Sequence, residues 1–103
     1  MSRVAQLEKM LAAEPNDPFA LYGLAQEHAK AGALARAVES YDRCLAADPS
    51  YHYAYFHKAR AQEAMGRADD AIGTLKTGIG RARAANDAKA LSELTSYLDE
   101  LTP

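Results

Sequence analysis

The pattern of hydrophobic and polar positions is clearest in the segment NDAKALSELTSYLDEL, residues 86–101. Four leucines recur there at intervals of three or four residues and form one apolar stripe on a helix: Leu91, Leu94, Leu98 and Leu101. Asn86 and Asp87 stand before this stripe, where an acceptor side chain can cap the first helical turn. We therefore expect a helix over residues 88–101 that covers an apolar surface with one of its faces.

Proline, glycine and capping residues mark the ends of the other helices. Asp17 precedes Pro18, and proline is favoured at the first position of a helix. Gly32 and Gly66 suit the left-handed conformation with which many helices end. Alanine is abundant while valine and isoleucine are scarce, which favours helix over strand. The helices expected before residue 86 span residues 3–14, 18–31, 34–47, 52–65 and 68–84.

The chain repeats itself with an offset of 34 residues. The segment LAAEP at 11–15 recurs as LAADP at 45–49. The same offset relates small residues, glycines and aromatic residues: Phe19 with Tyr53, Ala20 with Ala54, Tyr22 with Phe56, Ala25 with Ala59, Gly32 with Gly66, and Ala37 with Ala71. Each unit therefore consists of a helix, a tight turn and a second helix.

This unit of two helices resembles the tetratricopeptide repeat family, whose period is 34 residues. The positions that fit are Leu24, Ala25, Ala37, Tyr41 and Pro49 in one unit, and Tyr55, Ala59, Gly66, Ala71 and Leu75 in the next. The resemblance implies an all-α fold, in which antiparallel helix pairs form a right-handed superhelix with a C-terminal capping helix. It divides a single domain, 1–103, into a half repeat, two repeats and a capping helix: 3–15, 18–51, 52–85 and 86–101.

The chain departs from the family pattern in its last repeat. Arg83 replaces the proline that closes a unit, so the helix that starts near residue 68 is expected to continue past the usual end. Its interior holds Gly73, Gly78 and Gly80, and each glycine costs a helix about 1 kcal/mol relative to alanine. We therefore expect this helix to depend on packing against the capping helix.

Composition and charge narrow the possible partners and the compartment. The 103 residues carry a formal net charge of −2, which gives no reason to expect a nucleic-acid or membrane partner. The sequence has no apolar run of the length that a signal peptide or a membrane span needs. A single cysteine, Cys44, fits a reducing compartment. These features predict a soluble, cytoplasmic protein.

The residues that carry chemistry in enzymes and metal sites form no recognisable motif here. The three histidines, His28, His52 and His57, lack the spacing of a metal-binding helix. Cys44 takes a small-residue position in the repeat, where a buried and inert thiol is expected. The segment GIGRAR at 78–83 lacks the preceding strand and the third glycine of a dinucleotide-binding loop. We expect no enzymatic activity, no metal and no cofactor.

The aromatic residues of SYHYAYFHKA, 50–59, divide between core and surface in the repeat register. Tyr55 lies one turn before Ala59 on the buried side. The resemblance implies that the first helix of each unit lines a concave face and presents ligand-binding residues there. In this sequence those positions hold Phe19, Tyr22, Gln26, Lys30, Tyr53, Phe56, His57, Arg60 and Glu63. In the alternative interpretation the four rings among them are scaffold, packed in part on their neighbours.

For function, the resemblance implies a non-enzymatic module that binds a peptide segment or a partner helix in the concave groove. The partner is expected to be a protein or peptide, and the chain to be a monomer or a weak homodimer. The family also includes a clamp for C-terminal carboxylates, built from lysine, asparagine and arginine. Tyr22, Gln26 and His57 stand at its positions, which argues against such a clamp. The alternative function is a self-associating scaffold or assembly factor that uses exposed surfaces of the terminal helices.

Overall fold

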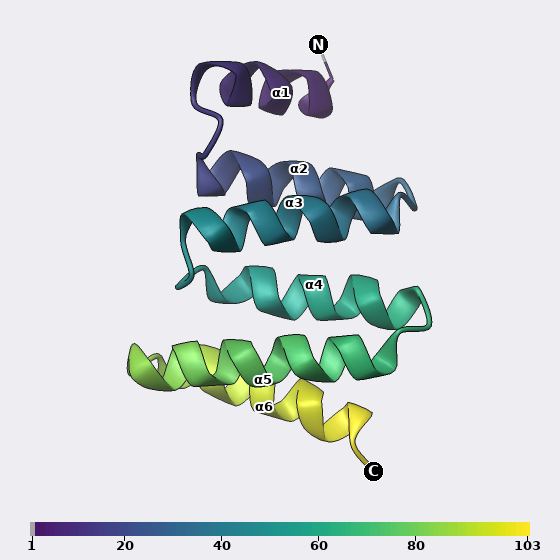
Figure 1. Cartoon of the computed structure of the whole chain (residues 1–103), viewed down its shortest axis with the longest axis vertical. Helices are drawn as coiled ribbons and strands as arrows, with labels where there is room; N and C mark the ends of the chain where they lie inside the picture. Colours follow the sequence, from purple (N-terminus) through teal and green to yellow (C-terminus); the bar gives the residue numbers. More distant parts are fainter. Residues whose placement is uncertain (1) are drawn as a thin grey trace.

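A computed structural model describes residues 2–103, and this part of the chain forms six helices and no strand (Figure 1). The helices are α1 (Arg3–Ala13), α2 (Pro18–Lys30), α3 (Leu34–Ala47), α4 (His52–Ala64), α5 (Ala68–Ala84) and α6 (Ala88–Leu101). Every helix boundary predicted from the sequence agrees with the structure to within one residue. The all-α prediction is therefore confirmed.

The helices stack in chain order along the long axis of a slab that measures 43 × 30 × 17 Å (Figure 1). Each helix packs against the next one in the sequence, and α4 also touches α2 and α6. Thus α2, α4 and α6 share one layer of the array, and Figure 1 shows α3 and α5 in front of it. No helix of residues 2–103 has both the length and the hydrophobicity to cross a membrane.

Side-chain caps and left-handed residues fix the helix ends. Asp17 accepts hydrogen bonds from the backbone N–H groups of Phe19 and Ala20, as the sequence predicts for a cap of α2. The backbone φ angle is 79° at Gly32 and 78° at Gly66, so both glycines end their helices in the left-handed conformation.

The turn between α5 and α6 uses its two capping candidates differently. Asp87 caps α6 by accepting a hydrogen bond from the Ala90 N–H group, and its carboxylate lies 3.0 Å from Nδ1 of His52 on α4. Asn86 does not cap α6. It adopts a φ angle of 56° and closes α5, in the place that glycine takes at the ends of α2 and α4. Asparagine is one of the few residues other than glycine that tolerates this conformation.

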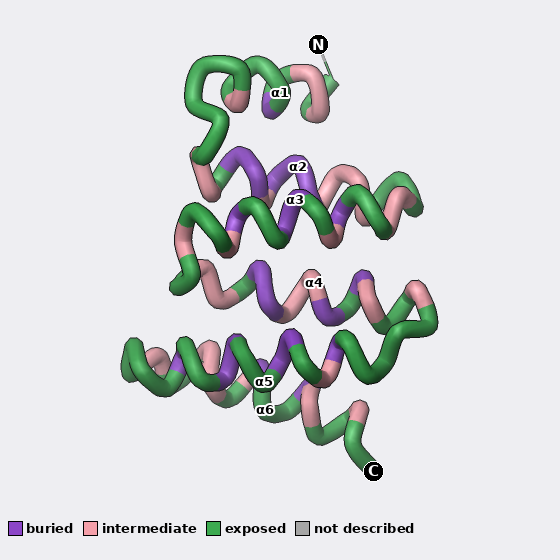
Figure 2. Tube along the Cα trace, in the orientation of Figure 1, coloured by how far each residue is buried: buried purple, intermediate pink, exposed green. Residues whose placement is uncertain are grey.

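Among the described residues, apolar side chains form three core clusters between the helices, and Figure 2 shows buried positions in every helix. Tyr55 is buried between α4 and α5, as predicted, and Cys44 is fully buried between α3 and its neighbours. The predicted leucine stripe of α6 packs on the same core as Tyr55, but only Leu94 is fully buried. Tyr97 is also buried there, and its role in the core was not predicted.

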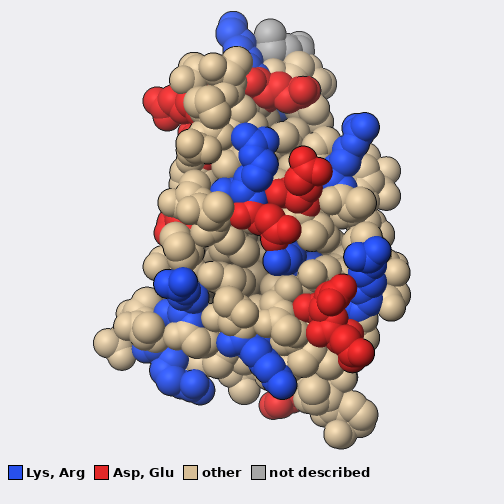
Figure 3. Space-filling view, in the orientation of Figure 1, with Lys and Arg blue, Asp and Glu red and all other residues tan. Residues whose placement is uncertain are grey.

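The face formed by α3 and α5 carries charges of both signs (Figure 3). Two carboxylates, Asp69 and Asp70, lie in the first turn of α5, and two guanidinium groups, Arg81 and Arg83, lie in its last turn. Acidic residues at a helix N-terminus and basic residues at its C-terminus stabilise the helix dipole.

Candidate functional site: a groove along α2, α4 and α6

Two hollows lie along the layer formed by α2, α4 and α6. The α2–α4 hollow has a volume of about 400 Å³ and is lined by Gln26, Ala29, Lys30, Leu34, Tyr41, His57, Arg60, Ala61 and Ala64. The α4–α6 hollow has a volume of about 560 Å³ and is lined by Phe56, Arg60, Glu63, Ser92, Glu93, Ser96, Tyr97 and Glu100. Arg60 lines both hollows, so they adjoin at its side chain. We refer to the two hollows together as the groove.

Aromatic side chains build the wall beside the α2–α4 hollow. The ring of Tyr22 is half-buried, and its centroid lies 4.8 Å from that of Tyr51, 6.0 Å from Tyr41 and 5.9 Å from His57. Nε2 of Gln26 donates a hydrogen bond of 3.0 Å to the Tyr22 hydroxyl. Burial raises the pKa of Tyr22 to about 12, so the hydroxyl stays protonated. These contacts fix Tyr22 and Gln26 in position.

His57 is a titratable group of the α2–α4 hollow whose pKa is shifted by its surroundings. Burial, and secondarily the positive charge of Arg60, lower the pKa of His57 below its usual value of 6.5. Its ring stacks on that of Tyr41 with an interplanar angle of 18°. The imidazole is therefore neutral at pH 7 and contributes an aromatic surface to the hollow.

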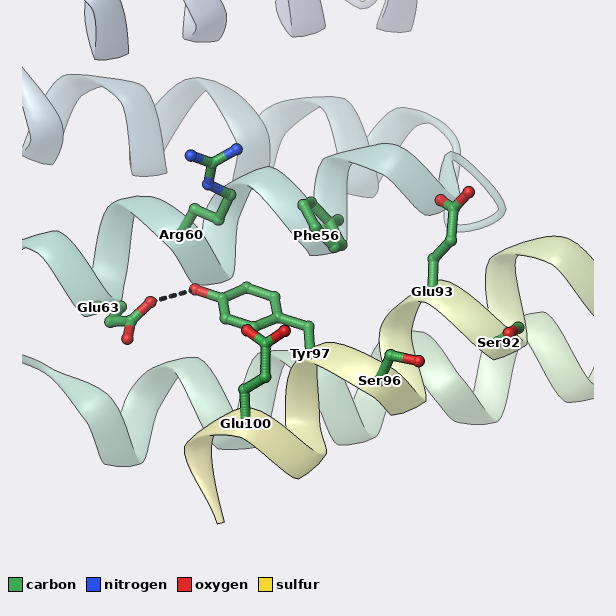
Figure 4. Close-up of a pocket in the computed structure, with 8 residues that line it drawn as sticks. All are labelled: Phe56, Arg60, Glu63, Ser92, Glu93, Ser96, Tyr97 and Glu100. Atoms are coloured by element: carbon green, nitrogen blue, oxygen red, sulfur yellow. Dashed lines mark hydrogen bonds between the residues drawn. The ribbon is translucent and has the colours of Figure 1, made fainter. Parts of the chain in front are cut away.

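The α4–α6 hollow combines two rings with several carboxylates (Figure 4). The centroids of Phe56 and Tyr97 lie 5.1 Å apart, and the Tyr97 hydroxyl donates a hydrogen bond of 2.6 Å to Oε1 of Glu63. Burial, followed by this hydrogen bond, raises the pKa of Tyr97. The bond spans α4 and α6 and holds the Glu63 carboxylate beside the ring.

The residues predicted for the groove fall into three groups. Gln26, Lys30, Phe56, His57, Arg60 and Glu63 line one or both hollows, and Tyr22 lies behind the α2–α4 hollow. Phe19 is 59% exposed and Tyr53 is 47% exposed, and neither lines the groove. Tyr53 instead lines a smaller hollow beside the α5–α6 turn. The structure therefore does not bring all four predicted rings into one groove.

Sequence reasoning took the groove residues from the two repeats and missed those of α6. The missed residues are Ser92, Glu93, Ser96, Tyr97 and Glu100. A signal for them is present in the sequence: residues 93, 97 and 100 have the same spacing as residues 56, 60 and 63, which line the hollow from α4. Residues at i, i+4 and i+7 share one face of a helix. The capping helix thus contributes to the groove as a first helix of a repeat does.

Histidine, cysteine and acidic side chains are the groups that could bind a metal ion or act as a nucleophile. Among the residues that the structure describes, no group of three or more histidine, cysteine, aspartate or glutamate side chains could hold a metal ion. The Cys44 thiol is fully buried, and burial raises its pKa to about 12. It therefore stays protonated at physiological pH, as expected for a thiol that packs in the core.

Solved structures that resemble this one are helical repeat domains. A tetratricopeptide repeat domain protein from Salinibacter ruber superimposes with a TM-score of 0.79 over 86% of this chain and 90% of its own, at 38% identity. The complex of the TPR2B domain of yeast Sti1 with pHsp70 gives a TM-score of 0.88 at 22% identity and covers 96% of this chain and 79% of that one. PcrH, in complex with the chaperone-binding region of PopD, gives a TM-score of 0.87 at 18% identity. The match covers 96% of this chain and 75% of PcrH. The last two likenesses show the fold alone.

Sequence comparison identifies the family to which this chain belongs. The model described as tetratricopeptide repeat matches residues 28–94, which is more than half of the chain. The TPR repeat-containing protein PA0015 of Pseudomonas aeruginosa is 32% identical over 95 residues, which span 92% of this chain and 90% of that protein. The protein therefore belongs to the tetratricopeptide repeat family, whose domains typically serve as interaction modules without enzymatic activity.

Proposed function

We propose that this protein is a non-enzymatic interaction module that holds a peptide segment or a partner helix in the groove along α2, α4 and α6. The observation that carries the proposal is the position of Arg60, which lines both hollows. The two hollows therefore adjoin at this side chain and together extend across three helices. A groove of this length suits a chain of several residues better than a compact small molecule.

The chemistry of the groove supports an interaction role. Each hollow lies within the range of about 300–1,000 Å³ that is typical of ligand sites. Four rings line the groove: Tyr41 and His57 in the α2–α4 hollow, and Phe56 and Tyr97 in the α4–α6 hollow. Rings offer contact area at a low cost in conformational entropy. Charged and amide side chains surround these rings, as in interfaces with an apolar centre and a polar rim.

Two structural neighbours were solved with protein partners. The TPR2B domain of Sti1 was captured with pHsp70, and PcrH with a region of PopD. Their low identity to this chain carries no partner across, but they use the same fold for binding. We further propose that the chain is a monomer or a weak homodimer. We also propose that it is cytoplasmic, because the one cysteine, Cys44, fits a reducing compartment.

Peptide binding in the groove can be tested by filling each hollow with a bulky side chain. Short random peptides displayed on phage would be selected against the intact chain, and the affinity of a selected peptide would be measured for tryptophan variants. Ser96→Trp fills the α4–α6 hollow and Ala64→Trp fills the α2–α4 hollow, both at exposed positions. Thr95→Trp, on the same helix as Ser96 but outside the hollows, is the matched control.

We expect Ser96→Trp or Ala64→Trp to weaken binding by about tenfold or more, which is about 1.4 kcal/mol, while Thr95→Trp binds as the wild type does. Selection of no peptide, or equal binding by all three variants, would overturn the proposal. Light scattering of the free protein tests the alternative function, in which the protein associates with itself. A mass that doubles with concentration would favour the self-associating scaffold.

A further inference from the structure

The two hollows of the groove differ in charge. The α2–α4 hollow contains the cationic groups of Lys30 and Arg60 and no carboxylate. The α4–α6 hollow contains three carboxylates, Glu63, Glu93 and Glu100, against the one guanidinium of Arg60. Lys30 is paired with Glu27 at 3.2 Å, so Arg60 supplies the remaining positive charge of the α2–α4 hollow, and the groove becomes negative towards the capping helix.

The negative charge of the α4–α6 hollow is not neutralised from within the described chain. None of the ion pairs among residues 2–103 includes Glu63, Glu93 or Glu100. Figure 4 shows the Arg60 side chain extending away from the Tyr97 ring and from Glu100. With three carboxylates and one guanidinium the hollow has a net negative charge, which a cationic group of a ligand would offset.

The rings of the same hollow suit a side chain that is long as well as cationic. Phe56 and Tyr97 lie against each other on its wall, and Glu93 and Glu100 flank Tyr97 on α6 (Figure 4). A lysine or arginine stem can lie along the rings while its charged end stays near the carboxylates and water. A cation above a ring face gains a further attraction from the ring's electrons.

Other side chains fit this hollow less well. An acidic side chain would meet three carboxylates and a single guanidinium, so like-charge repulsion would dominate. An apolar side chain could contact Phe56 and Tyr97, but it would also take water away from Glu93 and Glu100 without replacing their hydrogen bonds. Charge complementarity therefore selects a basic side chain.

We propose that the α4–α6 hollow is a subsite for a lysine or arginine side chain of the peptide or helix that the groove binds. The inference rests on the proposed interaction role and adds the chemistry of the ligand. It also places one residue of the bound segment, with its basic side chain next to the capping helix. Glu93 and Glu100 are the recognition residues, and Glu63 is a positioned third carboxylate, held by the Tyr97 hydroxyl.

The test compares two charge-removing variants in the same phage selection. Glu93→Gln/Glu100→Gln removes two carboxylates from the α4–α6 hollow, whereas Glu8→Gln/Glu39→Gln removes two exposed carboxylates from helices outside it. We expect wild type and the control variant to select peptides enriched in lysine or arginine at one position. The Glu93→Gln/Glu100→Gln variant should lose this enrichment.

One selected peptide would then be synthesised with its basic residue and with norleucine in that place. We expect the basic peptide to bind Glu93→Gln/Glu100→Gln about tenfold more weakly than wild type. Rising salt should weaken its binding to wild type more than its binding to the variant, because salt screens the charges that the variant lacks. The norleucine peptide should bind the variant no more weakly than wild type, because it lacks the charge that the two carboxylates recognise.

Each outcome separates this inference from the proposed function. If Ser96→Trp blocks selected peptides that carry no basic residue, the groove binds peptides and the charge inference is wrong. If the Glu93→Gln/Glu100→Gln variant binds the basic peptide as wild type does, the inference is also wrong. If the intact chain selects no peptide, both proposals fail.

Discussion

Gly78 of α5 lies so close to the Tyr55 ring of α4 that a Cβ atom at residue 78 would come within 2.7 Å of Tyr55 Cβ and 2.8 Å of Tyr55 Cγ. Real Cβ atoms essentially never approach heavy atoms so closely. The absence of a side chain at Gly78 thus lets α5 pack directly on the core aromatic of α4. The interior glycines of α5 therefore do not all weaken the fold, although helix propensity alone predicts the same cost for each of them.

Substitution by alanine should distinguish the glycine that allows close helix packing from the glycines that only lower helix propensity. Gly73→Ala and Gly80→Ala place a methyl group in open space, so we expect each to stabilise the fold by about 0.5–1 kcal/mol through helix propensity. Gly78→Ala should destabilise it, because relief of the clash with Tyr55 requires α5 to move and overpacking typically costs about 1–3 kcal/mol. Urea unfolding of the three variants measures this, and equal stabilisation by all three would contradict the packing role of Gly78.

Substitution by alanine of the three neighbouring aromatics of α4 should reduce stability in the order of their burial. Tyr55 is 5% exposed, so Tyr55→Ala should approach the roughly 3–5 kcal/mol typical of a large core aromatic. Tyr53 is 47% exposed, and Tyr53→Ala should cost much less. Phe56 packs on Tyr97 while lining the groove, so Phe56→Ala should fall between them and also weaken peptide binding. Thermal unfolding gives the order, and equal losses at all three positions would show that the assignment of faces is wrong.

Removal of residues 87–103 should destabilise the fold by several kcal/mol. The cut takes Leu94 and Tyr97 from the core, and full burial of one such side chain is worth about 1.5–3 kcal/mol. It also exposes the face of α5 that α6 covers. Hydrogen exchange should show the amides of α5 opening before those of α2. Unchanged protection of α5 after truncation would contradict the role assigned to the capping helix.

His57 should make stability depend on pH. Since the folded protein lowers the pKa of His57, the unfolded chain binds the proton first as the pH falls below about 6.5. Stability should therefore be unaffected by His57 above that pH, should fall as the pH decreases through it, and should level off below the folded pKa. His57→Gln should remove this part of the slope. An identical pH dependence of urea unfolding in wild type and His57→Gln would contradict the effect.

Most of the fold could be predicted because its signals are local and repeated. The 34-residue offset places Gly32 and Gly66 at equivalent helix ends, and both adopt the predicted left-handed conformation. Asn86 was harder to interpret, because asparagine serves both at helix starts and in left-handed positions. The role of Gly78 depends on the distance between two helices, which periodicity does not report.

The groove could be predicted only in part for a similar reason. The register within a repeat identifies the face of α4, so Phe56, Arg60 and Glu63 were found. The 34-residue offset does not extend to α6, so only the spacing of residues 93, 97 and 100 could indicate its groove face. The hydrogen bond from Tyr97 to Glu63 joins residues of two helices, which spacing within one helix does not predict. Phe19 and Tyr53 occupy equivalent positions by the repeat, yet both lie beside the groove in the first turns of their helices.

The central claim is that the face formed by α2, α4 and α6 binds a peptide, and amide chemical shifts in NMR test it most directly. A peptide selected against the intact chain would be titrated into isotope-labelled protein. We predict that the shifted amides cluster around the two hollows, at positions such as Gln26, His57, Arg60 and Ser96. Shifts confined to α1, or to the exposed sides of α3 and α5, would contradict the claim.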